Sequence, residues 1–118
     1  LHDALPIFGD MNENSFMVQL GWFTPQEIAS ARQDQGVVGD LAGYSFFNIQ
    51  GKPVDTVMND RVIGLSLEQL RSIPCVIAIA SESTKATAIL GALRTGVIDV
   101  LATSASNARS VINMQKAL

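Results

Sequence analysis

Two short stretches rich in small hydroxyl side chains are the parts of this sequence best suited to hold a polar ligand. They are ASESTK at 80–85 and ATSAS at 102–106, and their candidate binding residues are Ser81, Glu82, Ser83, Lys85, Thr103 and Ser104. Each stretch follows an apolar run and precedes a helical pattern, so backbone N–H groups at a helix start could hold an anion. Lys85 could add a positive charge for a phosphate. Ser and Thr at helix starts are capping residues first, which favours a structural role by about two to one for either stretch alone.

Three charged residues have competing interpretations. Glu82 would compete with an anion for the same N–H groups, but it could instead accept hydrogen bonds from sugar hydroxyls or simply favour the helix N-terminus. Lys85 could equally be a solvated lysine about one turn into its helix. Arg61 follows Asn59 and Asp60, and it could contact a phosphate or ring hydroxyl, or pair with a neighbouring acid.

Residues for catalysis are scarce in this sequence. The single histidine is His2 and the single cysteine is Cys75, so neither a Ser/His nor a Cys/His arrangement is available, and no zinc-ligand set exists. The aspartates at 40, 55, 60 and 99 show no paired spacing. We therefore predict no catalytic residue, no metal, no cofactor and no enzymatic activity. The lone cysteine excludes an intrachain disulfide and is consistent with a reducing cytoplasm.

Composition narrows the function further. The 118 residues are enough for one domain, and 47% hydrophobic with 16% charged residues is typical of a globular α/β protein. The net charge of −3 and the scattered Lys and Arg residues give no basic face for nucleic acid. No apolar run approaches the roughly 18 residues needed to cross a bilayer. The sequence thus predicts a protein that binds neither DNA by charge nor a membrane.

The order of the expected elements predicts the fold class. A helix should begin at the Thr24 cap, run from Pro25 to Gln35 and stop at Gly36. Residues 36–54 read as strand segments with a turn at Gln50-Gly51. Beyond them, strands at 61–66, 75–81 and 97–103 alternate with helices at 67–72, 84–95 and 107–118. Strands that alternate with helices form right-handed crossovers and a parallel sheet buried between helices.

The same stretches, taken together, resemble a known family. The segments VGD, FFNIQGKPV, NDRVIG, LEQLR, the lysine that opens the helix after CVIAIA, and ALRTGVIDVLAT occur in the order found in effector-binding domains of SorC-type transcriptional regulators. The resemblance runs from about Glu13 to the C-terminus. It implies a Rossmann-like fold akin to sugar-phosphate isomerases, a phosphorylated sugar as effector, homo-oligomers and a cytoplasmic location. DNA contact would be made only by a separate N-terminal helix-turn-helix domain.

The resemblance also indicates the binding residues. It points to Arg61, to the 80–85 loop with Lys85, and to the Thr103 loop. The chain departs from the family pattern where paired glycines are replaced by Ser81-Glu82 and where Thr-Asp-Glu is replaced by residues 103–105, Thr-Ser-Ala. Without those glycines the backbone approaches a phosphate less freely, so the ligand could differ or the pocket could be weakened. A sugar-phosphate isomerase or deaminase-like enzyme of the same superfold is the alternative function.

The resemblance covers the C-terminal half of such an effector domain. The first half and the DNA-binding domain would lie upstream. The opening residues LHDALPI match the translation of the end of a common sequencing adaptor. We therefore expect residues 1–7 to be an assembly artefact and residues 8–118 to be a partial sugar-binding effector domain, and we exclude His2 from functional arguments.

Overall fold

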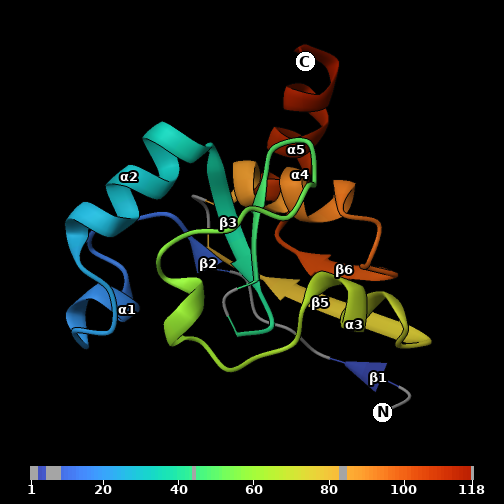
Figure 1. Cartoon of the computed structure of the whole chain (residues 1–118). Helices are drawn as coiled ribbons and strands as arrows, with labels where there is room; N and C mark the ends of the chain where they lie inside the picture. The colour runs from blue at the N-terminus through green and yellow to red at the C-terminus, as the bar shows by residue number, and fades with distance from the viewer. Residues whose placement is uncertain (1–2, 5–8, 44, 83–84, 118) are drawn as a thin grey trace.

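Two small three-stranded sheets organise the chain (Figure 1). The computed structural model describes residues 3–4, 9–43, 45–82 and 85–117. The parallel sheet has the strand order β1-β5-β6 and consists of β1 (Asp3–Ala4), β5 (Cys75–Ala80) and β6 (Val100–Thr103). The antiparallel sheet has the order β2-β3-β4 and consists of β2 (Gly9–Asp10), β3 (Val37–Leu41) and β4 (Ser45–Asn48).

Helices connect and cover these strands. They are α1 (Phe16–Gln19), α2 (Pro25–Gln35), α3 (Leu67–Arg71), α4 (Ala86–Arg94), α5 (Ala105–Ala117) and a 3-10 helix, η1 (Asn59–Arg61). We call residues 75–117 the parallel unit and residues 9–61 the antiparallel unit. None of the helices in the described ranges is long and apolar enough to cross a membrane.

Helix boundaries follow the capping signals in the sequence. The Thr24 hydroxyl accepts a hydrogen bond from the Glu27 N–H at 3.1 Å, and α2 ends at Gly36 in the left-handed conformation. Ser66 and Gln69 form a reciprocal capping box at the start of α3. Both helices therefore begin where their cap residues satisfy the free N–H groups of the first turn, as predicted.

The crossover from β5 through α4 to β6 is parallel, as predicted, with Ile77 beside Val100 and Ala80 beside Thr103. Asp99 extends this pairing in front of β6. Its carboxylate accepts from the Val76 N–H at 2.8 Å, while its own N–H donates to the Val76 carbonyl at 2.9 Å. The Asp99 carboxylate thus takes the place of a backbone carbonyl at the first hydrogen-bonded pair between β5 and β6.

The strand predicted at residues 61–66 is wrong. Residues 59–61 form η1 instead, after a turn in which the Asn59 amide oxygen accepts from the Thr56 N–H at 2.9 Å and from its hydroxyl at 2.8 Å. Ile63 is fully exposed at 103%, so this short apolar run does not form the buried face of a strand. Within the described ranges, the third strand of the parallel sheet is β1, which pairs with β5.

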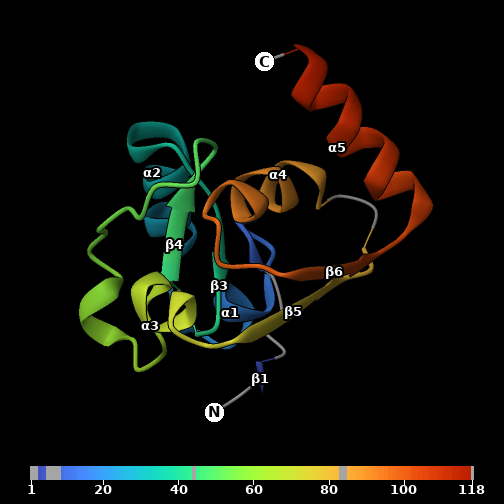
Figure 2. The same cartoon turned by 90° about the vertical axis from the view of Figure 1, so that its right-hand side faces the viewer.

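Two hydrophobic clusters share the core, and α4 lies between the two sheets. One cluster includes Leu41, Phe47 and Ile89, and the other includes Phe23 and Ile28. β5 buries Val76, Ala78 and Ala80 on one face, while Ile79 on the opposite face is 47% exposed. The expected sheet between two helical layers is therefore covered on one face and open on the other in the described part of the chain (Figure 2).

Close backbone contact joins the two units. A Cβ at Gly91 in α4 would lie 2.9 Å from the Asn48 carbonyl of β4. A Cβ at Gly51, whose φ is +81°, would lie 2.5 Å from the Thr95 nitrogen at the end of α4. These two glycines allow α4 to pack directly on β4 and on the turn that follows it.

Candidate functional site

The carboxyl ends of β5 and β6 bring the two predicted hydroxyl-rich loops together. Thr103, the last residue of β6, lies beside Ala80, the last residue of β5, and its hydroxyl donates to the Ala80 carbonyl at 2.5 Å. In an open parallel sheet this edge is where ligands bind, because the loops there lead into helix N-termini. The two predicted loops therefore begin side by side at this edge of the sheet.

Asn107 holds these loops together, and it was not among the predicted site residues. The side chain is almost completely buried, with the residue 1% exposed. Its amide Nδ2 donates to the Glu82 carbonyl at 2.8 Å and to the Thr103 hydroxyl at 3.1 Å. A signal for it existed in the sequence, because Asn107 stands four residues before Val111 and shares the buried face of α5.

Ser104 caps α5. Its hydroxyl accepts from the Asn107 N–H at 3.1 Å and lies 3.1 Å from the Ser106 hydroxyl. Ser104 is therefore the residue whose side chain caps the last helix. The capping interpretation of this loop is satisfied, and the hydroxyl group also stands at the electropositive end of a long helix.

Lys85 and Glu82 supply the charges of the site. Lys85 occupies the N-cap position of α4 rather than a place one turn into the helix, and it is only 8% exposed. Its ammonium nitrogen lies 3.7 Å from Glu82 Oε2, and the Glu82 side chain is 72% exposed. Ser81 is exposed, whereas Ser83 lies outside the described residues. A nearly buried cation thus sits beside the N-terminus of α4, with a carboxylate at the loop tip.

Arg61 is not part of this group. It forms an ion pair with Glu27, donates to the Trp22 carbonyl at 3.1 Å and lies 5.5 Å from the centroid of the Phe23 ring. Together with Trp22, Phe23, Val62 and Ile63 it lines a hollow of about 310 Å³. Figure 2 shows the segment near residue 60 and the carboxyl end of β5 on opposite sides of the molecule. These contacts fit the structural interpretation of Arg61. Its acidic partner is Glu27, which is distant in the sequence rather than a neighbour.

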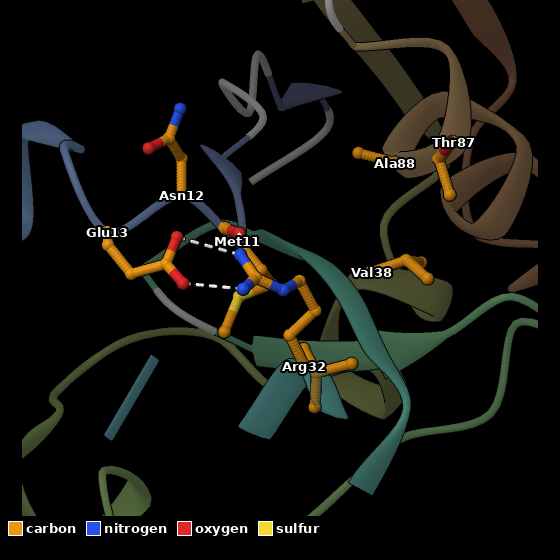
Figure 3. A pocket seen from close by; sticks show the side chains of 8 residues that line it. Met11, Asn12, Glu13, Arg32, Val38, Thr87 and Ala88 are labelled. Atoms are coloured by element: carbon orange, nitrogen blue, oxygen red, sulfur yellow. Dashed lines mark hydrogen bonds and ion pairs between the residues drawn. The ribbon is translucent and has the colours of Figure 1, made fainter. Parts of the chain in front are cut away.

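A larger hollow of about 390 Å³ lies beside the first turn of α4 (Figure 3). Thr87 and Ala88 form one side of it, and the ion pair between Arg32 and Glu13 stands opposite. The Arg32 guanidinium donates to both Glu13 carboxylate oxygens, at 2.8 Å and 2.5 Å. These hydrogen bonds lower the pKa of Glu13 and raise the pKa of Arg32. Since the two charges satisfy each other, this pair fastens the segment before α1 to α2.

The site at the ends of β5 and β6 is suited to binding a polar anion. It offers hydroxyl and amide groups, two helix N-termini and one nearly buried ammonium group, which are partners for a polar anion. Among the described residues there is no cluster of three or more His, Cys, Asp or Glu side chains that could hold a metal ion.

Comparison with protein families gives one match over most of the chain. A family model described as a sugar-binding domain matches residues 4–113. The match begins before Glu13, so it covers more of the chain than the motifs alone suggested. Both loops of the site and Asn107 lie inside the matched range.

Similar proteins are regulators of transcription. The sugar-binding domain of a transcriptional repressor from Vibrio fischeri is 56% identical, with a TM-score of 0.88, and the alignment covers 98% of this chain and 46% of that one. The deoxyribonucleoside regulator of Bacillus subtilis is 32% identical over 93% of this chain and 34% of its own length. The full-length sorbitol operon regulator SorC from Klebsiella pneumoniae is 25% identical, with a TM-score of 0.76, over 94% of this chain and 35% of that one. The chain thus spans about a third to a half of the length of these proteins.

Proposed function

Because the chain belongs to the sugar-binding domain family of SorC- and DeoR-type transcriptional regulators, we propose that it senses a phosphorylated sugar. The proposed site is the carboxyl edge of β5 and β6, with Ser81, Glu82, Ser83, Lys85, Thr103 and Ser104 around the ligand. Lys85 would bind the phosphate, and the helix N-termini would favour its negative charge. The hydroxyl and amide groups of the two loops would bind the sugar.

The burial of Lys85 is the observation that carries this proposal. The Lys85 side chain is 10% exposed, so its positive charge is largely removed from water. The Glu82 Oε2 atom lies 3.7 Å from the Lys85 ammonium nitrogen, and the Glu82 side chain is mostly exposed. A phosphate at the start of α4 would bring negative charge and hydrogen-bond acceptors to this buried cation.

Sugar binding would act on transcription through the assembly of the protein. In this proposal the chain works in a homo-oligomer in the cytoplasm, and a separate helix-turn-helix domain contacts the operator. The effector would bind two oligomeric arrangements with different affinity, which couples the sugar site to DNA binding.

A binding role is favoured over the enzymatic alternative. The similar proteins are regulators, and isomerisation or deamination of a sugar phosphate needs a positioned general base. Incubation with a sugar phosphate, followed by nuclear magnetic resonance, separates the two roles, because an enzyme would consume it.

The proposal is tested by calorimetric titration of the chain with ribose 5-phosphate and fructose 6-phosphate, and with ribose and fructose. We expect at least one phosphate ester to bind and its unphosphorylated sugar to bind at least ~10-fold more weakly, since a charge-assisted hydrogen bond contributes about 1.5–3 kcal/mol. Lys85→Ala should remove this preference. Lys116→Ala, at an exposed position on α5, should leave it unchanged.

Two results would contradict the proposal. One is equal affinity for a sugar and its phosphate ester. The other is a Lys85→Ala variant that keeps the preference while its circular dichroism spectrum matches the wild type.

A further inference from the structure

We infer that Asn107 joins the two loops of the sugar site through its Nδ2 group and accepts a hydrogen bond from a hydroxyl of the bound sugar through Oδ1. This inference rests on the proposed function, since it assigns the sugar-reading residue of the same site. Asn107 lies in the first turn of α5, a helix of 13 residues, directly behind the Ser104 cap.

The Nδ2 group provides the positioning part of the role. A side-chain amide has two N–H bonds, and here both are used: one reaches the Glu82 carbonyl at 2.8 Å and the other reaches the Thr103 hydroxyl at 3.1 Å. Thr103 in turn donates to the Ala80 carbonyl. Asn107 therefore ties the loop after β5 to the loop after β6, and it holds the Glu82 backbone in a fixed position relative to α5.

The Oδ1 atom provides the sugar-reading part. It is buried, and within the described part of the chain it has no hydrogen-bond partner. A buried acceptor without a donor is destabilising, because it has lost its hydrogen bonds to water. Both amide hydrogens of Asn107 already point to protein acceptors, so exchanging the positions of O and N would break two hydrogen bonds. We therefore assign the missing donor to a ligand group that enters between the two loops.

The chemistry of an amide oxygen selects the kind of ligand group. An amide oxygen accepts hydrogen bonds and cannot donate, and an ionised phosphate ester also only accepts. Oδ1 therefore fits a sugar hydroxyl and not the phosphate group, which belongs at Lys85. The hydroxyl would take the place of the protein atoms that cover Oδ1, next to Glu82, whose side chain is 72% exposed.

The test compares two probes on wild type, Asn107→Ala and Asn107→Asp. Ribose 5-phosphate carries hydroxyls and a phosphate, whereas inorganic phosphate carries no sugar. We expect Asn107→Ala to weaken ribose 5-phosphate binding by ~10-fold and inorganic phosphate binding by less than ~3-fold. Asn113→Ala, at an exposed asparagine on the same helix, should leave both affinities unchanged.

Amide hydrogen exchange tests the positioning part without any ligand. Both Asn107 variants lose the Nδ2 donor, so exchange at residues 80–82 should be ~2- to 10-fold faster than in wild type. Asn107→Asp is nearly isosteric and keeps oxygen acceptors, so it remains informative if the alanine variant fails to fold. Exchange at wild-type rates in both variants would overturn the positioning role.

The binding outcomes distinguish this inference from the proposed function. If Asn107→Ala weakens both probes equally, or neither, the sugar-reading role is overturned while the proposed function stands. If the wild type binds neither the sugar phosphates nor phosphate, the proposed function fails and the sugar-reading role falls with it. The positioning role is then decided by hydrogen exchange alone.

Discussion

The antiparallel unit and the parallel unit use their charged side chains in different ways. In the antiparallel unit, Arg32 is paired with Glu13 through two hydrogen bonds, and Arg61 is paired with Glu27. In the parallel unit, the loops at the ends of β5 and β6 are joined by neutral side chains, Thr103 and Asn107.

This difference identifies the charges of the antiparallel unit as structural. A bidentate pair between guanidinium and carboxylate satisfies both partners and leaves little affinity for a further anion. In the parallel unit, the Lys85 ammonium nitrogen lies 3.7 Å from Glu82 Oε2 at the start of α4. The charges beside the larger hollow at Arg32 therefore serve the structure, which favours the loops after β5 and β6 as the binding site.

The largest expected effect comes from breaking the contact between the two units. Gly51→Ala places a Cβ 2.5 Å from the Thr95 nitrogen and forces a left-handed conformation on alanine at φ +81°. Strain and overpacking together should lower the free energy of unfolding by about 3 kcal/mol or more. Urea unfolding followed by circular dichroism measures this loss. Gly21→Ala is the matched control, because its φ of +77° carries similar strain but no atom lies within 4 Å of its Cβ, and equal losses in both variants would disprove the contact argument.

An intermediate effect is expected within the parallel unit. Asp99→Ala removes the acceptor of the Val76 N–H, and Val76 is completely buried. An unpaired buried N–H group should cost about 1–3 kcal/mol of unfolding free energy. Asp99→Asn keeps an oxygen acceptor at this position and should restore most of the stability in the same urea titrations. A stable Asp99→Ala variant would show that β5 and β6 do not depend on this hydrogen bond.

The smallest effect concerns acid stability of the antiparallel unit. The hydrogen bonds from Arg32 lower the pKa of Glu13 below 4.5 in the folded protein. The stabilisation from this group is therefore present above the unfolded pKa and is lost as pH falls through the lower folded value. When the pH is lowered from 5.5 to 3, the melting temperature of the wild type should fall by more than that of the Glu13→Gln variant. Glu68→Gln, at an exposed position on α3, should behave as the wild type, and 1 M salt should reduce the contrast.

Local signals in the sequence were sufficient for helix ends and for the parallel crossover. Thr24 and Ser66 cap their helices through side chains next to the free N–H groups, an interaction that depends on residues three positions apart. The strand prediction at 61–66 failed because contacts distant in sequence determine this segment. Arg61 reaches Glu27, and the Leu65 N–H donates to the Ala42 carbonyl at 3.1 Å.

The candidate site was predictable in part. The strand-loop-helix order located both loops, since carboxyl ends of neighbouring parallel strands meet at one edge. The buried amide of Asn107 escaped prediction because an asparagine near a helix start is usually a surface or capping residue. Its spacing from Val111 was the available sign, and only the packing of α5 shows that this face is buried.

The glycine contacts at residues 51 and 91 also bear on how such a domain can evolve. Where backbone meets backbone, a single substitution cannot adjust the spacing of α4 and β4 in small steps, because even a methyl group is too large at Gly91. We therefore expect the packing of α4 on β4, and with it the relative position of the two units, to stay constant as the sequence evolves. Ligand preference can then diversify through the loops after β5 and β6, where Ser81 and Glu82 are exposed and their replacement disturbs no core contact.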